Sequence, residues 1–143
     1  TPLPKQTIGN WLDAADSYAL DQTIDALQQL IPNDGTSLYN AFNSINQYKK
    51  PPDNIFLLTD GLPTQGKNKP SANTISEERR YRLFTDALTL LPKRVPINII
   101  LFPMEGDPRA AAAYWQLAIN TKGAFLTPSR DWPLQKNAVC SKK

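Results

Sequence analysis

An apolar stretch near the middle of this chain, Ile55-Phe56-Leu57-Leu58, stops abruptly at Thr59-Asp60-Gly61. A short, continuous apolar run of this kind is typical of a strand that is buried on both faces of a sheet. Asp60 would then lie just beyond the carboxyl end of the strand, which is where open α/β sheets bind their ligands. We therefore expect an inner strand over residues 55–59, with Asp60 facing a ligand site.

A second feature, Gly35-Thr36-Ser37, opens an amphipathic segment whose apolar residues recur at helical spacing. This pattern places Thr36 at the start of a helix that can lie beside the end of strand 55–59. A threonine hydroxyl and an aspartate carboxylate are hard oxygen ligands of the kind that Mg²⁺ takes. The two features together predict a metal site formed by Thr36 and Asp60.

The expected elements follow one another as helix, helix, strand, helix, strand, helix and strand. Such alternation predicts an α/β fold: a Rossmann-like, doubly wound, mainly parallel sheet with helices on both faces. We read residues 60–75 as an exposed polar loop, and Thr74 with Glu77 as a capping box that opens the next helix. The expected helices are 17–31, one from Thr36 to Pro51, one from Thr74 to Pro92, and 108–121; the expected strands are 55–59, 95–102 and 124–127.

The helix over 108–121 has clear end signals. Asp107 followed by Pro108 is a strong helix start, and Gly123 is a natural stop. We expect four of its residues to pack into the core: Ala111, Trp115, Ala118 and Ile119.

Composition excludes several classes of function. The chain has no histidine among its 143 residues, which removes histidine-based triads and histidine metal ligands. Cys140 is the single cysteine and cannot form an internal disulfide. The net charge of +3 is spread among interspersed charges, so we expect no nucleic-acid partner. No apolar run approaches the ~20 residues of a membrane span.

The stretch from Phe56 to Gly66, read with Gly35-Thr36, resembles the von Willebrand factor A (VWA) family, and bacterial members in particular. The resemblance covers residues 17–133, which we take as a single partial VWA-like domain within residues 1–133, followed by a tail at 134–143. Members of this family bind metal with a threonine after glycine, an aspartate at a later strand end and an Asp-x-Ser-x-Ser motif. That last motif is absent here, so the chain looks like the later two-thirds of such a domain.

The resemblance implies a non-catalytic adhesion module. Mg²⁺, or Mn²⁺, would be held by Thr36 and Asp60, weakly or not at all in this chain, and would bridge to an acidic residue of another protein. Residues expected to contact that partner are Gly35, Ser37, Gly61 and Thr64. Without the missing central strand, strand 55–59 would expose an open edge. Three arrangements can cover it: the missing part supplied from upstream in the natural protein, the N-terminal residues of this chain, or a second copy of the chain in a homodimer. By resemblance alone, the protein is expected outside the cytoplasm or at a membrane of a bacterium.

Plainer interpretations remain open for each residue. Asp60-Gly61 also fits a simple turn, Thr36 or Ser37 a helix N-cap, Asp107 a helix cap, and the loop 62–67 either a contact surface or a solvated linker. A Mg²⁺-dependent phosphoryl hydrolase with Asp60 as nucleophile or ligand is an alternative function, since similar sheets host many chemistries. A structural remnant without metal is another.

Overall fold

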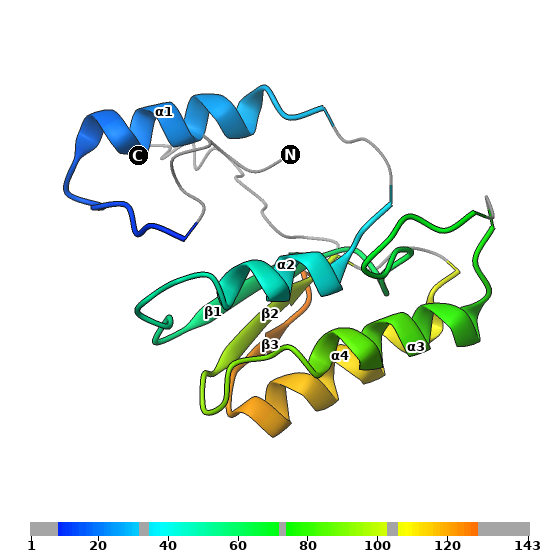
Figure 1. The fold of residues 1–143 in the computed structure, drawn as a ribbon. Coiled ribbons are helices and arrows are strands. Elements are labelled where there is room, and N and C mark those ends of the chain that lie inside the picture. Colours follow the sequence, from blue (N-terminus) through cyan, green and yellow to red (C-terminus); the bar gives the residue numbers. More distant parts are fainter. Residues whose placement is uncertain (1–8, 32–34, 72–73, 103–105, 129–143) are drawn as a thin grey trace, which may run out of the picture. The chain divides into compact units, whose positions relative to one another are not determined.

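The computed structural model describes residues 9–31, 35–71, 74–102 and 106–128. The chain divides into two compact units, which we describe separately. The helical unit comprises residues 1–53 and 62–95, and the sheet unit comprises residues 54–61 and 96–143. The helices and strands follow one another in the predicted order, so a mixed α/β fold is confirmed (Figure 1).

The sheet unit is built on three parallel strands in the order β1-β2-β3. The strands are β1 (Ile55–Thr59), β2 (Ile97–Leu101) and β3 (Phe125–Leu126). In the register, Ile55 lies opposite Ile97 and Thr59 opposite Leu101, so β1 and β2 end at the same edge. The predicted parallel sheet is therefore present, while the doubly wound arrangement with helices on both faces stays a prediction.

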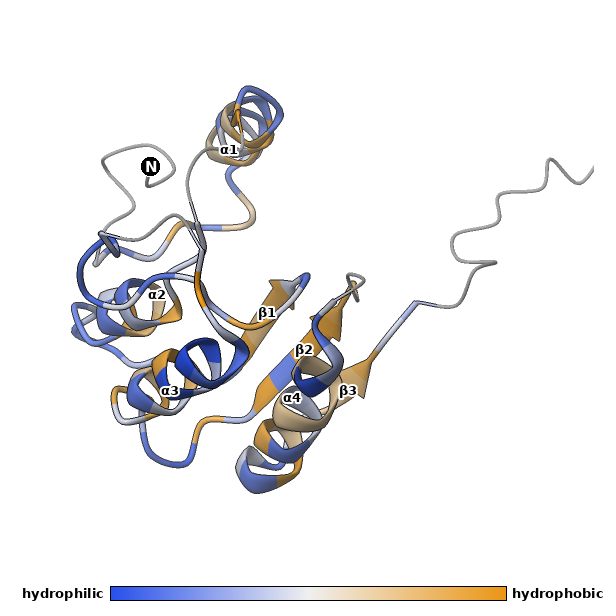
Figure 2. Ribbon diagram, turned by 90° about the vertical axis from the view of Figure 1, so that its right-hand side faces the viewer, coloured by the Kyte–Doolittle hydropathy of each residue, from blue (hydrophilic) through white to orange (hydrophobic). Residues whose placement is uncertain are grey.

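One face of this sheet packs against helix α4 (Pro108–Thr121), whose length agrees with the prediction. Figure 2 shows α4 running alongside strands that are mostly apolar. Of the four residues predicted to be buried, Ala118 is buried, whereas Ala111 is exposed and Trp115 and Ile119 are 53% and 50% exposed. Tyr114, which was not predicted, is fully buried. The core of the unit consists of Ile97, Ile99 and Leu101 from β2 and of Ala110, Ala113, Tyr114, Leu117 and Ala118 from α4.

The opposite face of the sheet is partly exposed. Phe56, Leu58 and Leu126 are 67%, 62% and 60% exposed, and Leu58, Ile100 and Leu126 form one row across the three strands. The expectation that strand 55–59 is buried on both faces was therefore wrong. Successive side chains of a strand point to opposite faces, and only alternate residues of β1 are shielded.

Helix α4 ends at a close approach between backbones. Lys122 adopts the left-handed conformation (φ 61°) at the C-cap, and the N–H of Gly123 donates to the carbonyl of Ala118 at 2.8 Å. A Cβ on Gly123 would overlap the backbone carbonyl of Ile97 in β2. Gly123 thus ends the helix, as predicted, but it is required for its small size and not for a positive φ.

The helical unit contains α1 (Ser17–Gln28), α2 (Leu38–Ile45) and α3 (Glu77–Leu88). Helices α2 and α3 pack against each other and bury Leu38, Phe42, Phe84 and Ala87. Helix α3 begins at Ser76, whose side chain accepts from the N–H of Arg79, so the predicted Thr74–Glu77 capping box was wrong. Helix α1 buries none of its side chains, and its apolar stripe is exposed.

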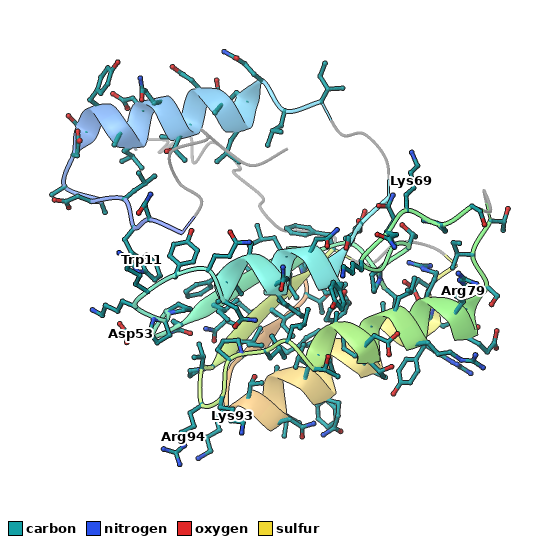
Figure 3. All side chains as sticks on the ribbon, in the orientation of Figure 1. Trp11, Asp53, Lys69, Arg79, Lys93 and Arg94 are labelled. Atoms are coloured by element: carbon teal, nitrogen blue, oxygen red, sulfur yellow. The ribbon has the colours of Figure 1, made fainter. Side chains whose placement is uncertain are left out.

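Trp11 ties the start of the described chain to the segment after α2. Its indole N–H donates to the carbonyl of Lys50 at 3.0 Å, and its ring lies 4.9 Å from that of Tyr48, centroid to centroid. Figure 3 shows Trp11 in this position. Residues far apart in the sequence are thereby joined within the helical unit.

Candidate functional site

Asp60 follows directly on β1 and is exposed. The strand stays paired up to its last residue, because the N–H of Phe102 donates to the carbonyl of Thr59 at 2.8 Å. Since parallel strands end at the same edge, Asp60 and the segment after β2 share the carboxyl edge of the sheet. This is the edge at which open α/β sheets bind ligands, and the predicted position of Asp60 is confirmed.

The turn after Asp60 is anchored from the interior of the sheet unit. The hydroxyl of Tyr114 donates to the carbonyl of Gly61 at 2.9 Å, and the hydroxyl of Thr59 donates to the same carbonyl at 3.0 Å. Thr59, Gly61 and Tyr114 are buried, whereas Asp60 is exposed. The backbone on both sides of Asp60 is therefore fixed while its carboxylate faces solvent.

In the helical unit, Ser37 is the N-cap of α2. Its hydroxyl accepts from the N–H of Asn40 at 3.2 Å and donates to the carbonyl of Gly66 at 2.7 Å. Thr36 is exposed, and its hydroxyl makes no hydrogen bond within the described ranges. Of the two plainer interpretations, capping therefore belongs to Ser37 and not to Thr36.

The backbone of Thr36 holds the loop that follows residue 61. Its carbonyl accepts from the N–H groups of Thr64 and Gln65, each at 3.0 Å, and its own N–H donates to the hydroxyl of Thr64 at 3.0 Å. A Cβ on Gly35 would overlap that hydroxyl. Thr36 and Thr64 are therefore joined by two hydrogen bonds, and glycine is needed at position 35 for space.

The loop 62–66 is less exposed than predicted. Leu62 and Pro63 are fully buried, and residues 64–66 are partly buried. The guanidinium group of Arg80 in α3 donates to the carbonyl of Leu62 through Nη2 at 2.6 Å and Nε at 3.2 Å. The expectation of an exposed loop from residue 60 onward was wrong here, because Leu62-Pro63 supplies apolar surface and Arg80 holds the backbone.

Helix α4 begins as predicted, but by a different contact. Asp107 is at the N-cap position and Pro108 at the first turn, yet the side chain of Asp107 makes no capping hydrogen bond. The carbonyl of Asp107 accepts from the N–H of Ala110 at 3.2 Å. Asp107 is 8% exposed, so it presents little surface to a ligand. Glu105, the other acidic residue of the segment between β2 and α4, lies outside the described residues.

The expected metal ligands fall in different units: Thr36 in the helical unit and Asp60 in the sheet unit. Their meeting at one ion therefore stays a prediction. Over the described ranges, no group of three or more histidine, cysteine, aspartate or glutamate residues is placed to hold a metal. The predicted site has one hydroxyl and one carboxylate, so the lack of such a group in these ranges does not test it. Both of its groups are accessible hard oxygen donors.

Two residues that we did not single out, Tyr114 and Arg80, hold backbone carbonyls near the site, and the sequence contained a signal for the first. Ala110, Ala113, Tyr114, Leu117 and Ala118 recur at the spacing of one helical face, which predicts a buried Tyr114. No comparable signal marks Arg80, because its partner is a backbone carbonyl.

Comparison with known proteins adds no assignment: no family model, curated protein or solved structure matches this chain. In the part of the chain that is described, none of the helices combines the length and apolar character needed to cross a membrane.

Proposed function

We propose that this chain is a non-catalytic protein-binding module related to VWA domains, in which Thr36 and Asp60 hold one Mg²⁺ or Mn²⁺ ion. The observation that carries the proposal is the accessible carboxylate of Asp60, fixed just beyond the carboxyl end of a parallel strand. The Gly-Thr segment supports it, because Ser37 caps α2 and leaves the Thr36 hydroxyl without an internal role in the described chain.

The chemistry of such an ion suits recognition of an acidic group. Mg²⁺ takes six oxygen ligands in near-octahedral geometry and commonly keeps several waters. A neutral hydroxyl and a single carboxylate balance only one of the ion's two positive charges. An aspartate or glutamate of a partner protein can replace one water and complete the site, so we expect weak metal binding that the partner strengthens.

The residues around the ion would shape the contact with the partner. Gly35 is exposed and close to Thr64, whereas the hydroxyls of Ser37 and Thr64 are engaged in hydrogen bonds and Gly61 is buried. We therefore assign Ser37, Gly61 and Thr64 mainly to holding the surface in shape.

We also propose that a second copy of the chain covers the open edge of β1. Among the described strands, β1 pairs on one side only, and Ile55–Thr59 contains no charge and no proline. Charged residues, prolines and bulges are the usual protection of an edge strand. An unprotected edge favours pairing with an identical strand around a two-fold axis.

Paramagnetic broadening by Mn²⁺ in amide NMR spectra tests the metal site. Substoichiometric Mn²⁺ is expected to broaden the signals of residues 35–37 and 60–61 together, and Asp60→Asn to abolish both effects. Residues near Asp53, at the other end of β1, serve as the internal control. Broadening around only one of the two segments would contradict a shared ion. A phosphatase assay tests the alternative function: Mg²⁺-dependent turnover that is lost in Asp60→Asn would show an enzyme and overturn the proposed adhesion module.

A further inference from the structure

The interior of the sheet unit contains a hydroxyl that reaches the turn carrying Asp60. Tyr114 lies within α4 and is 0% exposed, and its hydroxyl donates to the carbonyl of Gly61 at 2.9 Å. Thr59 donates to the same carbonyl at 3.0 Å, and the two hydroxyl oxygens are 3.4 Å apart. Two buried donors thus converge on the carbonyl of Gly61, one residue beyond Asp60.

Burying these polar groups costs free energy unless each of them has a hydrogen-bond partner. A buried polar group without a partner carries a desolvation cost, and the Gly61 carbonyl avoids it by accepting from the hydroxyls of Tyr114 and Thr59. Ala113 and Leu117, on either side of Tyr114 in α4, are 9% and 4% exposed. The close-packed helix therefore holds the phenol ring in one place.

We propose that Tyr114 is a positioning residue for Asp60. This inference rests on the proposed function, since it assigns Tyr114 to the same metal site. The Tyr114 hydroxyl fixes the carbonyl of Gly61, in the second peptide group after Asp60, and the ladder bond from Phe102 to the Thr59 carbonyl fixes the peptide group before Asp60. The backbone that carries the carboxylate is thereby held on both sides. A ligand held on a rigid support loses less conformational freedom when the metal binds.

The placement also links α4 to the site. Through the buried side chain of Tyr114, α4 bonds to the turn after Asp60, so a shift of α4 relative to β1 would move the Gly61 carbonyl. The tyrosine touches neither the ion nor the partner and acts only through the backbone.

The test compares two variants of α4 in the full chain by calorimetric titration with Mg²⁺. Tyr114→Phe keeps the ring and removes the hydroxyl, and it is expected to weaken Mg²⁺ binding at least threefold, as for loss of about one hydrogen bond. Leu117→Val, a buried change one turn further along, is the matched control. It is expected to lower the melting temperature to a similar extent while leaving Mg²⁺ affinity unchanged.

Equal Mg²⁺ affinity of Tyr114→Phe and the unchanged chain would overturn the inference, as would equal weakening in Leu117→Val. If the unchanged chain does not bind Mg²⁺, the proposed function fails, and amide hydrogen exchange decides the positioning role separately. Faster exchange confined to residues 60–62 in Tyr114→Phe would support it. Exchange that rises equally throughout the chain, or does not change, would refute it.

Discussion

Neighbouring residues in this chain perform different physical tasks. Ser37 caps α2 and bonds to Gly66, while Thr36 next to it uses only its backbone within the described chain and exposes its hydroxyl. In the same way, Thr59 and Gly61 are buried on either side of the exposed Asp60. Residues proposed to bind metal thus alternate with residues that hold the backbone in place, and each role can be tested by a single substitution.

Lys122 and Gly123 provide a test of backbone constraints. Gly123→Ala would place a Cβ on the carbonyl of Ile97, and since β2 would have to shift, we expect a loss of about 2 kcal/mol or more, or roughly 8 °C in Tm. Lys122→Gly relieves the left-handed conformation at φ 61° and is expected to leave Tm unchanged or raise it slightly. Thermal unfolding followed by circular dichroism measures both, and equal Tm for Gly123→Ala and the unchanged chain would contradict the close approach.

At the scale of whole elements, signals within a short stretch of sequence predicted features that depend on that stretch alone. Strand 55–59 and helix 108–121 were predicted with their observed bounds, because an apolar run ending at Asp-Gly and an Asp-Pro start with a glycine stop are signals within the sequence. Helix faces were harder to predict. Trp115 was predicted to be buried, but its burial depends on which side of α4 meets β2. On that side lies Tyr114, whose hydroxyl donates to the carbonyl of Gly61.

The loop 62–66 was mispredicted for a related reason. Its composition is that of an exposed loop, yet partners distant in the sequence bury it: Thr36 and Ser37 hydrogen-bond its backbone, and Arg80 binds the carbonyl of Leu62. The candidate site was likewise predictable only in part. The sequence indicated Asp60 and Thr36 by type and position, but not the groups that hold their backbones.

Whether the contact between Arg80 and Leu62 holds the backbone of this loop in place can be tested by substitution. Arg80→Met removes two hydrogen bonds to the carbonyl of Leu62 and is expected to cost about 1–2 kcal/mol, with faster hydrogen exchange at residues 62–66. Arg79→Met is the matched control, because Arg79 is exposed beside it on α3 (Figure 3). Similar exchange rates at residues 62–66 in the two variants would show that Arg80 does not hold the loop.

At the scale of the whole molecule, the sheet is small and two of its surfaces are unprotected. β1 has an open edge among the described strands, and the face carrying Phe56, Leu58 and Leu126 is apolar and exposed. Exposed apolar edges and faces favour association. These features agree with the proposed pairing of two copies.

Sedimentation velocity tests this pairing. The unchanged chain is expected to sediment as a dimer, and Leu58→Lys as a monomer, because it places a charge on an exposed position of the edge strand. Trp115→Lys, at an exposed apolar position on α4, should remain dimeric. A monomeric unchanged chain at high concentration would contradict the proposal.

The central claim is that Thr36 and Asp60 bind one divalent ion, and calorimetric titration with Mg²⁺ tests it most directly. We expect a saturable heat for the unchanged chain and for Asp53→Asn, which alters an exposed carboxylate before β1. The heat should be lost or strongly reduced in both Asp60→Asn and Thr36→Val. The same heat in Asp60→Asn as in the unchanged chain, or no heat in any of them, would contradict the metal site and favour a structural domain without metal.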